Sequence, residues 1–373
     1  MIKRVVVAFL IIAYIFSLTS CSNIWCLFTG FEFYDGDEIK EIIPYETQLY
    51  IVTENALYIE GGYERTDSKA YRNVELYEDE ALGLPKPVLL FEGKISQIIP
   101  IDDLKALIIT DEGKLYKFDE FEVALLHENI VCADSWYAQD CIYAVDSNHK
   151  LISIENGESK IIADGINDVE VYRDRIFAIN NSAQMREVLI ENERVSFGEV
   201  LFEGASSFEI EDTSVRYDGK KIVFDNEEAI NTPLFNVLDT DNRLYAKGVY
   251  NLLACGSSSS SPIPMEFLDE WTLISENVQQ FSLAKMGTAF KLEDGTCAYY
   301  GFETNLHADS NFEYKTLSVS NASNIYATSL LVCANSINGH YIWGNNFYKL
   351  FYGSSEHNVL SGTPYVLKNG KTN

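Results

Sequence analysis

Short apolar runs recur along this chain, and each is followed by a polar turn and a second apolar run that carries an aromatic residue. Residues 106–109 and 115–118, for example, flank the turn Asp111-Glu112-Gly113. Asp-Gly and Asn-Gly turns supply the positive φ that tight hairpins need, and the flanking β-branched and aromatic residues favour strands. Each unit therefore predicts a β-hairpin. The hairpins centre on residues 55, 113, 148, 181, 219, 242, 295 and 339.

The spacing of these hairpins predicts the architecture. The turns at 219 and 242 are too close for two separate four-stranded sheets, so we assign both to one sheet, which leaves seven units. Hairpin units that repeat every ~40–50 residues without helical stretches are typical of propeller blades. We therefore expect an all-β fold, a seven-bladed β-propeller over residues 39–373. Radial packing of the blades would also explain an aromatic content of 13%.

Two segments carry a family resemblance. Residues 238–256 and residues 341–353, the latter with the run Trp343-Gly344-Asn345-Asn346, resemble the repeat of the regulator of chromosome condensation family. The resemblance extends over about 232–368, whereas only the hairpin half of the repeat persists upstream. It implies an RCC1-like propeller. Because propellers of that family mostly bind proteins, it also implies a binding role.

The two ends of the chain predict how the ring closes. Residues 365–368, Tyr-Val-Leu-Lys, have the pattern of the opening strand of a blade whose remainder is missing, and residues 39–62 supply the complementary strands. We expect the C-terminal strand to pair with the N-terminal blade and complete it. Such closure removes exposed sheet edges, which otherwise invite aggregation.

The N-terminus has the pattern of a bacterial lipoprotein leader. Lys3 and Arg4 precede an apolar stretch, 5–16, that is shorter than the ~20 residues of a membrane span. Leu18-Thr19-Ser20-Cys21 resembles the lipoprotein box, in which the cysteine is diacylated and becomes the first mature residue. We expect a signal peptide over 1–20, a lipidated tether over 21–38, and an extracytoplasmic propeller anchored to the bacterial cell membrane through Cys21. An ordinary cleaved signal or an uncleaved anchor is the alternative.

The charge of the chain restricts its partners. With 28 Lys+Arg against 56 Asp+Glu, the net charge is −28. Nucleic acid is therefore excluded as a partner, because sequence-independent binding to it depends on Lys and Arg that neutralise phosphates. Anionic lipid surfaces repel such a body as well, so the lipid anchor is the expected contact with the membrane.

Cysteines and histidines show little specialised chemistry. Cys132 and Cys141 flank residues 133–140, as two residues that face each other across a hairpin would, so a disulfide between them is one interpretation. We favour the other interpretation, in which both cysteines act as small buried apolar residues. No spacing typical of a zinc site occurs. We expect His149 and His340, in or beside hairpin turns, to be solvated. The acidic turns 35–38 and 239–242 offer oxygens to calcium, but neither has the EF-hand pattern, so we expect no metal and no cofactor.

Aromatic residues in two polar loops are the candidate contacts with a partner: Tyr63, Tyr71 and Tyr77 in the acidic tract 63–87, and Trp136 with Tyr137. We expect a non-enzymatic protein whose loops bind an extracytoplasmic protein or glycan. The alternative is a propeller hydrolase or lyase that acts on extracellular polysaccharide or peptide. Two carboxylates ~5–9 Å apart in a pocket, one with a raised pKa, would favour the enzyme, and a broad aromatic patch would favour binding.

Overall fold

A computed structural model describes residues 38–45, 48–62, 83–102, 104–191, 194–217, 222–223, 230–251, 265–302, 312–328, 331–344, 365–368 and 371–372. Every regular element among these residues is a β-strand. Within the same ranges no helix is long and apolar enough to cross a membrane.

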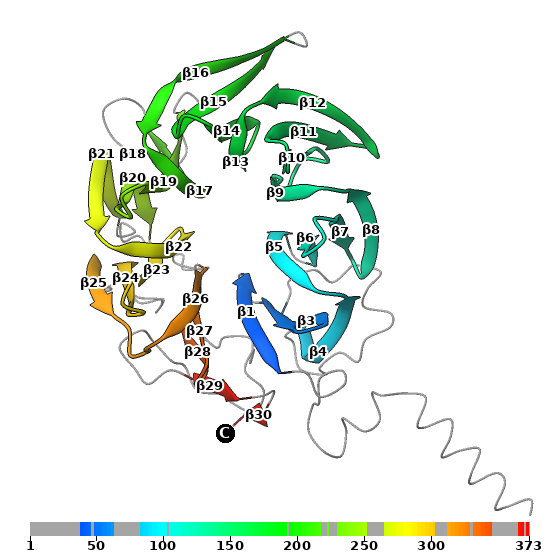
Figure 1. Ribbon diagram of the computed structural model, residues 1–373. Helices are drawn as coiled ribbons and strands as arrows, with labels where there is room; N and C mark the ends of the chain where they lie inside the picture. The colour runs from blue at the N-terminus through cyan, green and yellow to red at the C-terminus, as the bar shows by residue number, and fades with distance from the viewer. Residues whose placement is uncertain are drawn as a thin grey trace, which may run out of the picture.

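Seven antiparallel sheets surround a common axis, which confirms the predicted seven-bladed β-propeller (Figure 1). Blades one and two contain β1 (Ile39–Tyr45), β2 (Gln48–Thr53), β3 (Ala56–Gly62), β4 (Gly83–Glu92), β5 (Ile95–Asp102), β6 (Lys105–Thr110), β7 (Leu115–Asp119) and β8 (Glu122–His127). Blades three and four contain β9 (Ile130–Asp134), β10 (Ile142–Asp146), β11 (Lys150–Glu155), β12 (Glu158–Asp164), β13 (Ile166–Tyr172), β14 (Arg175–Asn180), β15 (Gln184–Glu191) and β16 (Arg194–Glu203).

Blade five contains β17 (Ala205–Tyr217), β18 (Ile222–Val223), β19 (Ile230–Asp239), β20 (Leu244–Asn251) and β21 (Met265–Ser275). Blades six and seven contain β22 (Val278–Ala284), β23 (Gly287–Leu292), β24 (Cys297–Phe302), β25 (Phe312–Thr316), β26 (Ala322–Ala327), β27 (Leu331–Ser336), β28 (Gly339–Gly344), β29 (Tyr365–Lys368) and β30 (Lys371–Thr372). The hairpins β17–β18 and β19–β20 lie in one sheet, so the assignment of the turns at 219 and 242 to one blade is confirmed.

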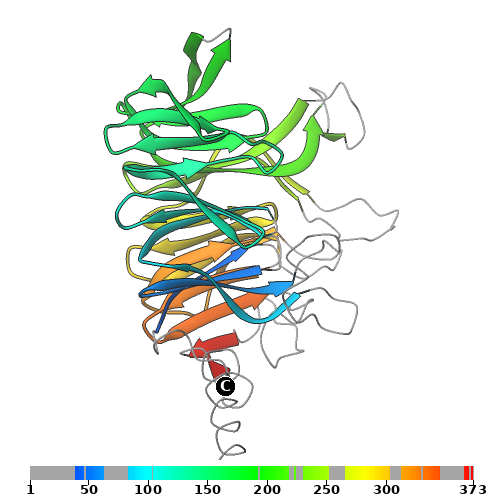
Figure 2. The same cartoon turned by 90° about the vertical axis from the view of Figure 1, so that its right-hand side faces the viewer.

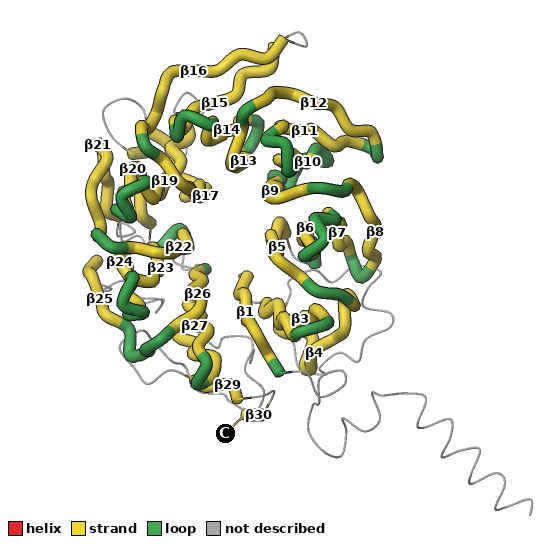
Figure 3. The backbone as a smooth tube through the Cα atoms, viewed as in Figure 1, coloured by secondary structure: helices red, strands yellow, loops and turns green. Residues whose placement is uncertain are grey.

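Position within a blade explains the apolar patterns. Strands β1, β5, β9, β13, β17, β22 and β26 face the axis, and the blades stack side by side around it (Figure 1, Figure 2 and Figure 3). Every residue of β2 and of β27 is buried, because the second strand of a blade is covered on both faces by its neighbours. The outer strands β8 and β12 are largely exposed. Continuous apolar runs in the sequence thus mark second strands.

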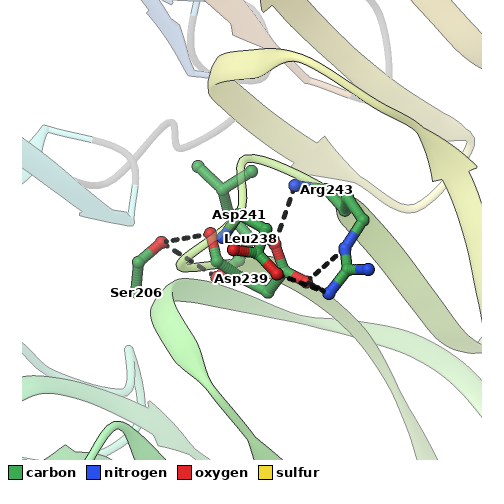
Figure 4. Close-up of polar contacts among 5 residues, drawn as sticks. All are labelled: Ser206, Leu238, Asp239, Asp241 and Arg243. Atoms are coloured by element: carbon green, nitrogen blue, oxygen red, sulfur yellow. Dashed lines mark hydrogen bonds and ion pairs between the residues drawn. The ribbon is translucent and has the colours of Figure 1, made fainter.

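A side chain at the end of the second strand fixes the hairpin turn that follows. In blade five, Asp239 Oδ1 accepts hydrogen bonds from the backbone N–H groups of Asp241 (2.9 Å) and Arg243 (2.8 Å) (Figure 4). Asp146 and Asn180 make the same pair of contacts in blades three and four. These short polar side chains reinforce the backbone hydrogen bonds of the turn.

The predicted closure of the ring is wrong. Strand β29 pairs with β28 inside blade seven, with Ile342 opposite Tyr365 and His340 opposite Leu367. Blade one is complete without it, because β4 already occupies the outer edge of β3. The seam between the first and last blades is held by side-chain contacts instead. They include an apolar cluster that joins Ile42 and Tyr58 to Leu331 and other residues of both blades.

Candidate functional site

A cavity of about 810 Å³ lies on the propeller axis. All seven inner strands line it, so every blade contributes to the wall. The lining continues past the end of β9 to Trp136 and Tyr137 and past the end of β22 to Lys285, which places the cavity toward the face on which the inner strands end. Concave sites of this size that gather side chains from many elements are the usual places for ligands.

Carboxylates dominate the charged lining. Lys285 is the one basic side chain among the described residues around the cavity. The acidic residues are Glu41, Asp102, Asp134, Asp168, Glu170, Glu209, Glu211 and Asp212. Asp212 has a partner outside the cavity, because Arg173 Nη2 lies 2.8 Å from its Oδ2. Such a concentration of one charge within low-dielectric walls focuses a negative potential into the cavity.

Asp134 and Glu170 form a carboxyl pair across the junction of blades three and four, with their side chains hydrogen-bonded to each other. Asp134 Oδ2 also accepts a hydrogen bond of 2.6 Å from Val171 N. Burial raises the pKa of Asp134 to about 6, although the backbone donors lower it. Burial, and then repulsion by Asp134, Asp168 and Glu209, raises the pKa of Glu170 well above its ordinary value. The pair therefore holds its protons to higher pH than two isolated carboxyl groups would.

Two further carboxyl groups extend this cluster toward blade six. Burial raises the pKa of Asp168 to about 7 and the pKa of Glu209 to about 8. Glu209 Oε2 accepts a hydrogen bond of 2.6 Å from Leu283 N, in the inner strand of the next blade. Asp168 accepts a bond of 3.0 Å from Val169 N and contacts the Cys132 thiol. Carboxyl groups whose pKa is raised to near neutrality within a cavity are candidate functional groups.

The predicted aromatic pair lies beside this cavity. The ring centroids of Trp136 and Tyr137 are 4.9 Å apart, and Trp136 packs edge-on against Tyr172 at 5.7 Å. Tyr137 is 56% exposed, whereas Trp136 is half-buried. One ring is thus fixed by packing while the other presents its face to solvent. The other predicted contacts, Tyr63, Tyr71 and Tyr77, and the predicted lipidation site Cys21 lie outside the described residues.

Cys132 and Cys141 are both free thiols in the structure. In the register of the β9–β10 hairpin, Cys132 lies opposite Val145 rather than Cys141, which precedes β10. Cys297 and Cys333 are free and buried, as their strand positions predict.

The carboxylate oxygens of the turn 239–242, which the sequence offers as calcium ligands, bind an arginine of the protein instead. Arg243 Nε and Nη2 approach Asp239 Oδ2 at 2.8 and 2.7 Å, and Arg243 Nη2 lies 3.0 Å from Asp241 Oδ2 (Figure 4). A guanidinium group therefore occupies the place that calcium would take in the turn 239–242. Residues 35–37 of the other acidic turn lie outside the described residues. Among the residues that the structure describes, no group of three His, Cys, Asp or Glu side chains is arranged to hold a metal ion.

His340 departs from the sequence prediction. His149 is exposed in its turn, but His340 is only 6% exposed, because it follows the turn into β28 and faces blade one. Its Nε2 lies 3.1 Å from Ile39 O. Burial lowers the pKa of His340, which favours the neutral ring.

The carboxyl cluster was missed by sequence reasoning, although a signal for it exists. Residues with positive φ precede the inner strands: Asn129, Gly165, Gly204 and Asn277. Counting from these, the third and fifth positions face the cavity, and they hold the pairs Cys132/Asp134, Asp168/Glu170, Ser207/Glu209 and Gln280/Ser282. Aligning the blades on Asn or Gly before an apolar strand would have placed these carboxyl groups together.

No family model and no curated protein matches the sequence. Solved structures do match. Prp20p from Saccharomyces cerevisiae, reported with its binding properties to Gsp1p and histones, is 11% identical with a TM-score of 0.55, over 89% of this chain and 88% of that one. The complex of Kap60 with yeast RCC1 (Prp20) matches at 13% identity and a TM-score of 0.50, over 75% of this chain and 78% of the other.

PorZ, a surface component of the type-IX secretion system of Porphyromonas gingivalis, matches at 12% identity and a TM-score of 0.46, over 86% of this chain and 38% of its own. At such identities a structural match establishes fold alone. By its seven blades and by the two matches to Prp20, the chain is an all-β propeller similar in fold to RCC1.

Proposed function

We propose that this protein is a non-enzymatic binding protein, and that the face around the axial cavity binds a protein partner through basic side chains. The observation that carries the proposal is the lining of the cavity, in which eight carboxyl groups surround one lysine. A Lys or Arg side chain that enters the cavity neutralises charges that otherwise repel one another. The exposed ring of Tyr137 adds apolar contact area beside it.

Binding to Lys- and Arg-rich peptides at low and moderate salt tests this proposal. We expect Tyr137→Ala and the double variant Asp134→Asn/Glu170→Gln each to weaken binding at least fivefold. Ile337, which is 88% exposed in the β27–β28 turn, provides an apolar control, Ile337→Ala. Glu122→Gln/Glu158→Gln removes two exposed charges from outer strands and controls for net charge. Equal losses in the double variant and this charge control would contradict a cavity-centred site.

We further propose that the propeller lies outside the cell, anchored to the bacterial cell membrane by a lipid on Cys21. The box 18–21 and the net charge of −28, which disfavours direct contact with anionic lipid, support it. Intact-mass measurement of the full chain from a bacterial membrane fraction tests it. We expect a mass that begins at Cys21 and includes acyl chains, and a soluble product from Cys21→Ala. An unmodified mature mass would overturn the proposal.

One observation favours the alternative of a propeller hydrolase or lyase that acts on extracellular polysaccharide or peptide. Asp168, with its pKa raised to about 7, can hold a proton for transfer to a leaving group at neutral pH. The contact between Asp134 and Glu170, however, leaves no space for a substrate between those two carboxyl groups. Release of sugars or peptides from cell-envelope material, lost in Asp168→Asn, would establish this alternative.

A further inference from the structure

The joints between neighbouring blades differ around the ring. From blade three to blade six, a carboxyl group on one inner strand accepts a backbone N–H from the next inner strand. Asp134 binds Val171 N at 2.6 Å, Asp168 accepts from the backbone of Phe208, and Glu209 binds Leu283 N at 2.6 Å. Three successive joints are thus made by groups that can gain or lose a proton.

At the joints from blade six through blades seven and one to blade two, the side chains that accept a backbone N–H group are neutral. Between blades six and seven, Gln280 Oε1 accepts from Ile325 N at 3.1 Å and Ser282 Oγ accepts from Ala327 N at 3.0 Å. Between blades seven and one, Asn335 Oδ1 accepts from Ile42 N at 2.9 Å. Between blades one and two, Gln48 Oε1 accepts from Leu104 N at 3.4 Å. Amides and hydroxyls at these joints keep one protonation state across the physiological range.

Other charged and titratable groups face the cluster from each packed element: Glu41, Asp102, Cys132, Glu211, Asp212, Lys285 and Tyr326. Glu41 accepts hydrogen bonds from Tyr326 at 2.5 Å and from Asn324, and Arg173 pairs with Asp212. Burial raises the pKa of Cys132 and of Tyr326, so both stay neutral. Among the described residues that line the cavity, Lys285 is therefore the one cation against several anions.

We propose that the propeller consists of two unlike arcs. The titratable arc, blades three to six, loses stability as its buried carboxyl groups lose their protons and repel one another. In the fixed arc, blades six through seven and one to two, amides and a hydroxyl accept the backbone N–H groups across the joints. The inference goes beyond the proposed function, because it concerns the protein without any partner.

The direction of the effect follows from linkage. A carboxyl group whose pKa is higher in the folded chain than in the unfolded chain stabilises the fold fully below the unfolded value, near 4, and this contribution is lost as the pH rises through the folded value. The pKa values of Asp134, Asp168 and Glu209 in the folded chain, through which this contribution is lost, are about 6, 7 and 8. The titratable arc is therefore most stable in mildly acidic solution.

Hydrogen exchange of the full chain at pH 5.5 and pH 8.5, corrected for intrinsic rates, tests the proposal. We expect protection of β9, β13, β17 and β22 to fall at pH 8.5 by about tenfold or more, since one pKa unit corresponds to a tenfold change. Protection of β1 and β26 should stay within about threefold. Because burial also raises the pKa of Glu60 in β3 to about 8, the comparison is made in a Glu60→Gln background. Equal changes in both arcs would overturn the proposal.

Two variants separate this effect from net charge. Asp134→Asn/Glu170→Gln keeps an oxygen acceptor for Val171 N but removes two titratable groups, so the pH response of β9 should shrink, while Asp168 maintains part of the response of β13. Glu122→Gln/Glu158→Gln also removes two carboxyl groups, at exposed outer positions, and should leave the response intact. A variant-free measurement, carbon-13 titration of the Asp and Glu carboxyl groups, should show at least three groups that titrate above pH 5.5. Titration of all resolved groups below pH 5 would also refute the proposal.

Discussion

Asn335 in the last blade pairs through its side-chain amide with the backbone of Ile42 in the first. Ile42 N donates to Asn335 Oδ1 at 2.9 Å, and Asn335 Nδ2 donates to Ile42 O at 3.2 Å. His340 Nδ1 lies 2.8 Å from the same Oδ1. The Asn335 side chain thus joins the first and last blades, because it satisfies both backbone polar groups of Ile42, a residue of the inner strand. In other closed rings, a strand shared between the two ends of the chain makes this connection.

Replacing this amide should weaken the whole ring. In Asn335→Ala the buried N–H and C=O of Ile42 lose their partner, and we expect the free energy of unfolding to fall by about 2–3 kcal/mol. Denaturant unfolding measures the loss. Asn338→Ala, at an exposed position in the adjacent turn, should stay within about 0.5 kcal/mol. Similar values for both variants would show that the seam does not limit stability.

Close approach of two strands requires glycine at Gly301. A Cβ there would lie 2.3 Å from Gly287 Cα, and the φ of Gly301 is +155°. Because both overpacking and backbone strain arise, we expect Gly301→Ala to destabilise the fold by about 3 kcal/mol or more. Gly157, with φ of +81° and nothing within 4 Å of its Cβ, is the matched control. Gly157→Ala should cost about 1–2 kcal/mol from the backbone alone, and a ranking opposite to this would refute the packing argument.

The turn at Asp239 should depend on its arginine and not on calcium. Asp239→Ala removes two backbone contacts and an ion pair with Arg243, so we expect a loss of about 1–3 kcal/mol in thermal or denaturant unfolding. Asp241→Ala, whose side chain is 72% exposed, should change stability by less than about 1 kcal/mol. Millimolar calcium should not raise the melting temperature of the wild-type chain. A clear calcium-dependent rise that Asp239→Ala abolishes would restore the metal site.

Glu60 should make the stability depend on pH. Burial raises its pKa to about 8, so the fold loses stability as the pH rises from the unfolded value, near 4.5, toward 8. We expect Glu60→Gln to match the wild type at pH 5 and to exceed it by more than about 1 kcal/mol at pH 8.5. Unfolding curves at the two pH values test this. Glu92→Gln, at an exposed position in β4, should show no such divergence.

The blade count could be predicted from the sequence because local signals determine it. Turn residues and fully apolar second strands, such as Leu107–Ile109, recur wherever a blade must turn and be covered on both faces. The partner of β29 could not be predicted in this way, because Tyr365–Lys368 has the same apolar pattern whichever edge it joins. Pairing there depends on which edge is free, a property of the assembled ring.

The carboxyl cluster escaped the sequence for a related reason. Asp134, Asp168 and Glu209 lie far apart along the chain and meet because the register of each inner strand turns the same positions toward the axis. The exposure of His340 was predicted wrongly. Residues beside a turn are usually exposed, whereas the ring of His340 points into the seam. Trp136 and Tyr137, in contrast, could be singled out from composition alone, since a tryptophan in a polar loop is unusual.

In the part of the chain that the structure describes, each sheet is built from consecutive strands, and no strand of one blade pairs in the sheet of another. Insertion or loss of one such set of strands in the gene would therefore add or remove a whole blade without severing any hydrogen-bonded ladder. Duplication of a stretch one blade long would thus change the circumference of the ring, and with it the width of the axial cavity, while the contacts between the first and last blades are kept.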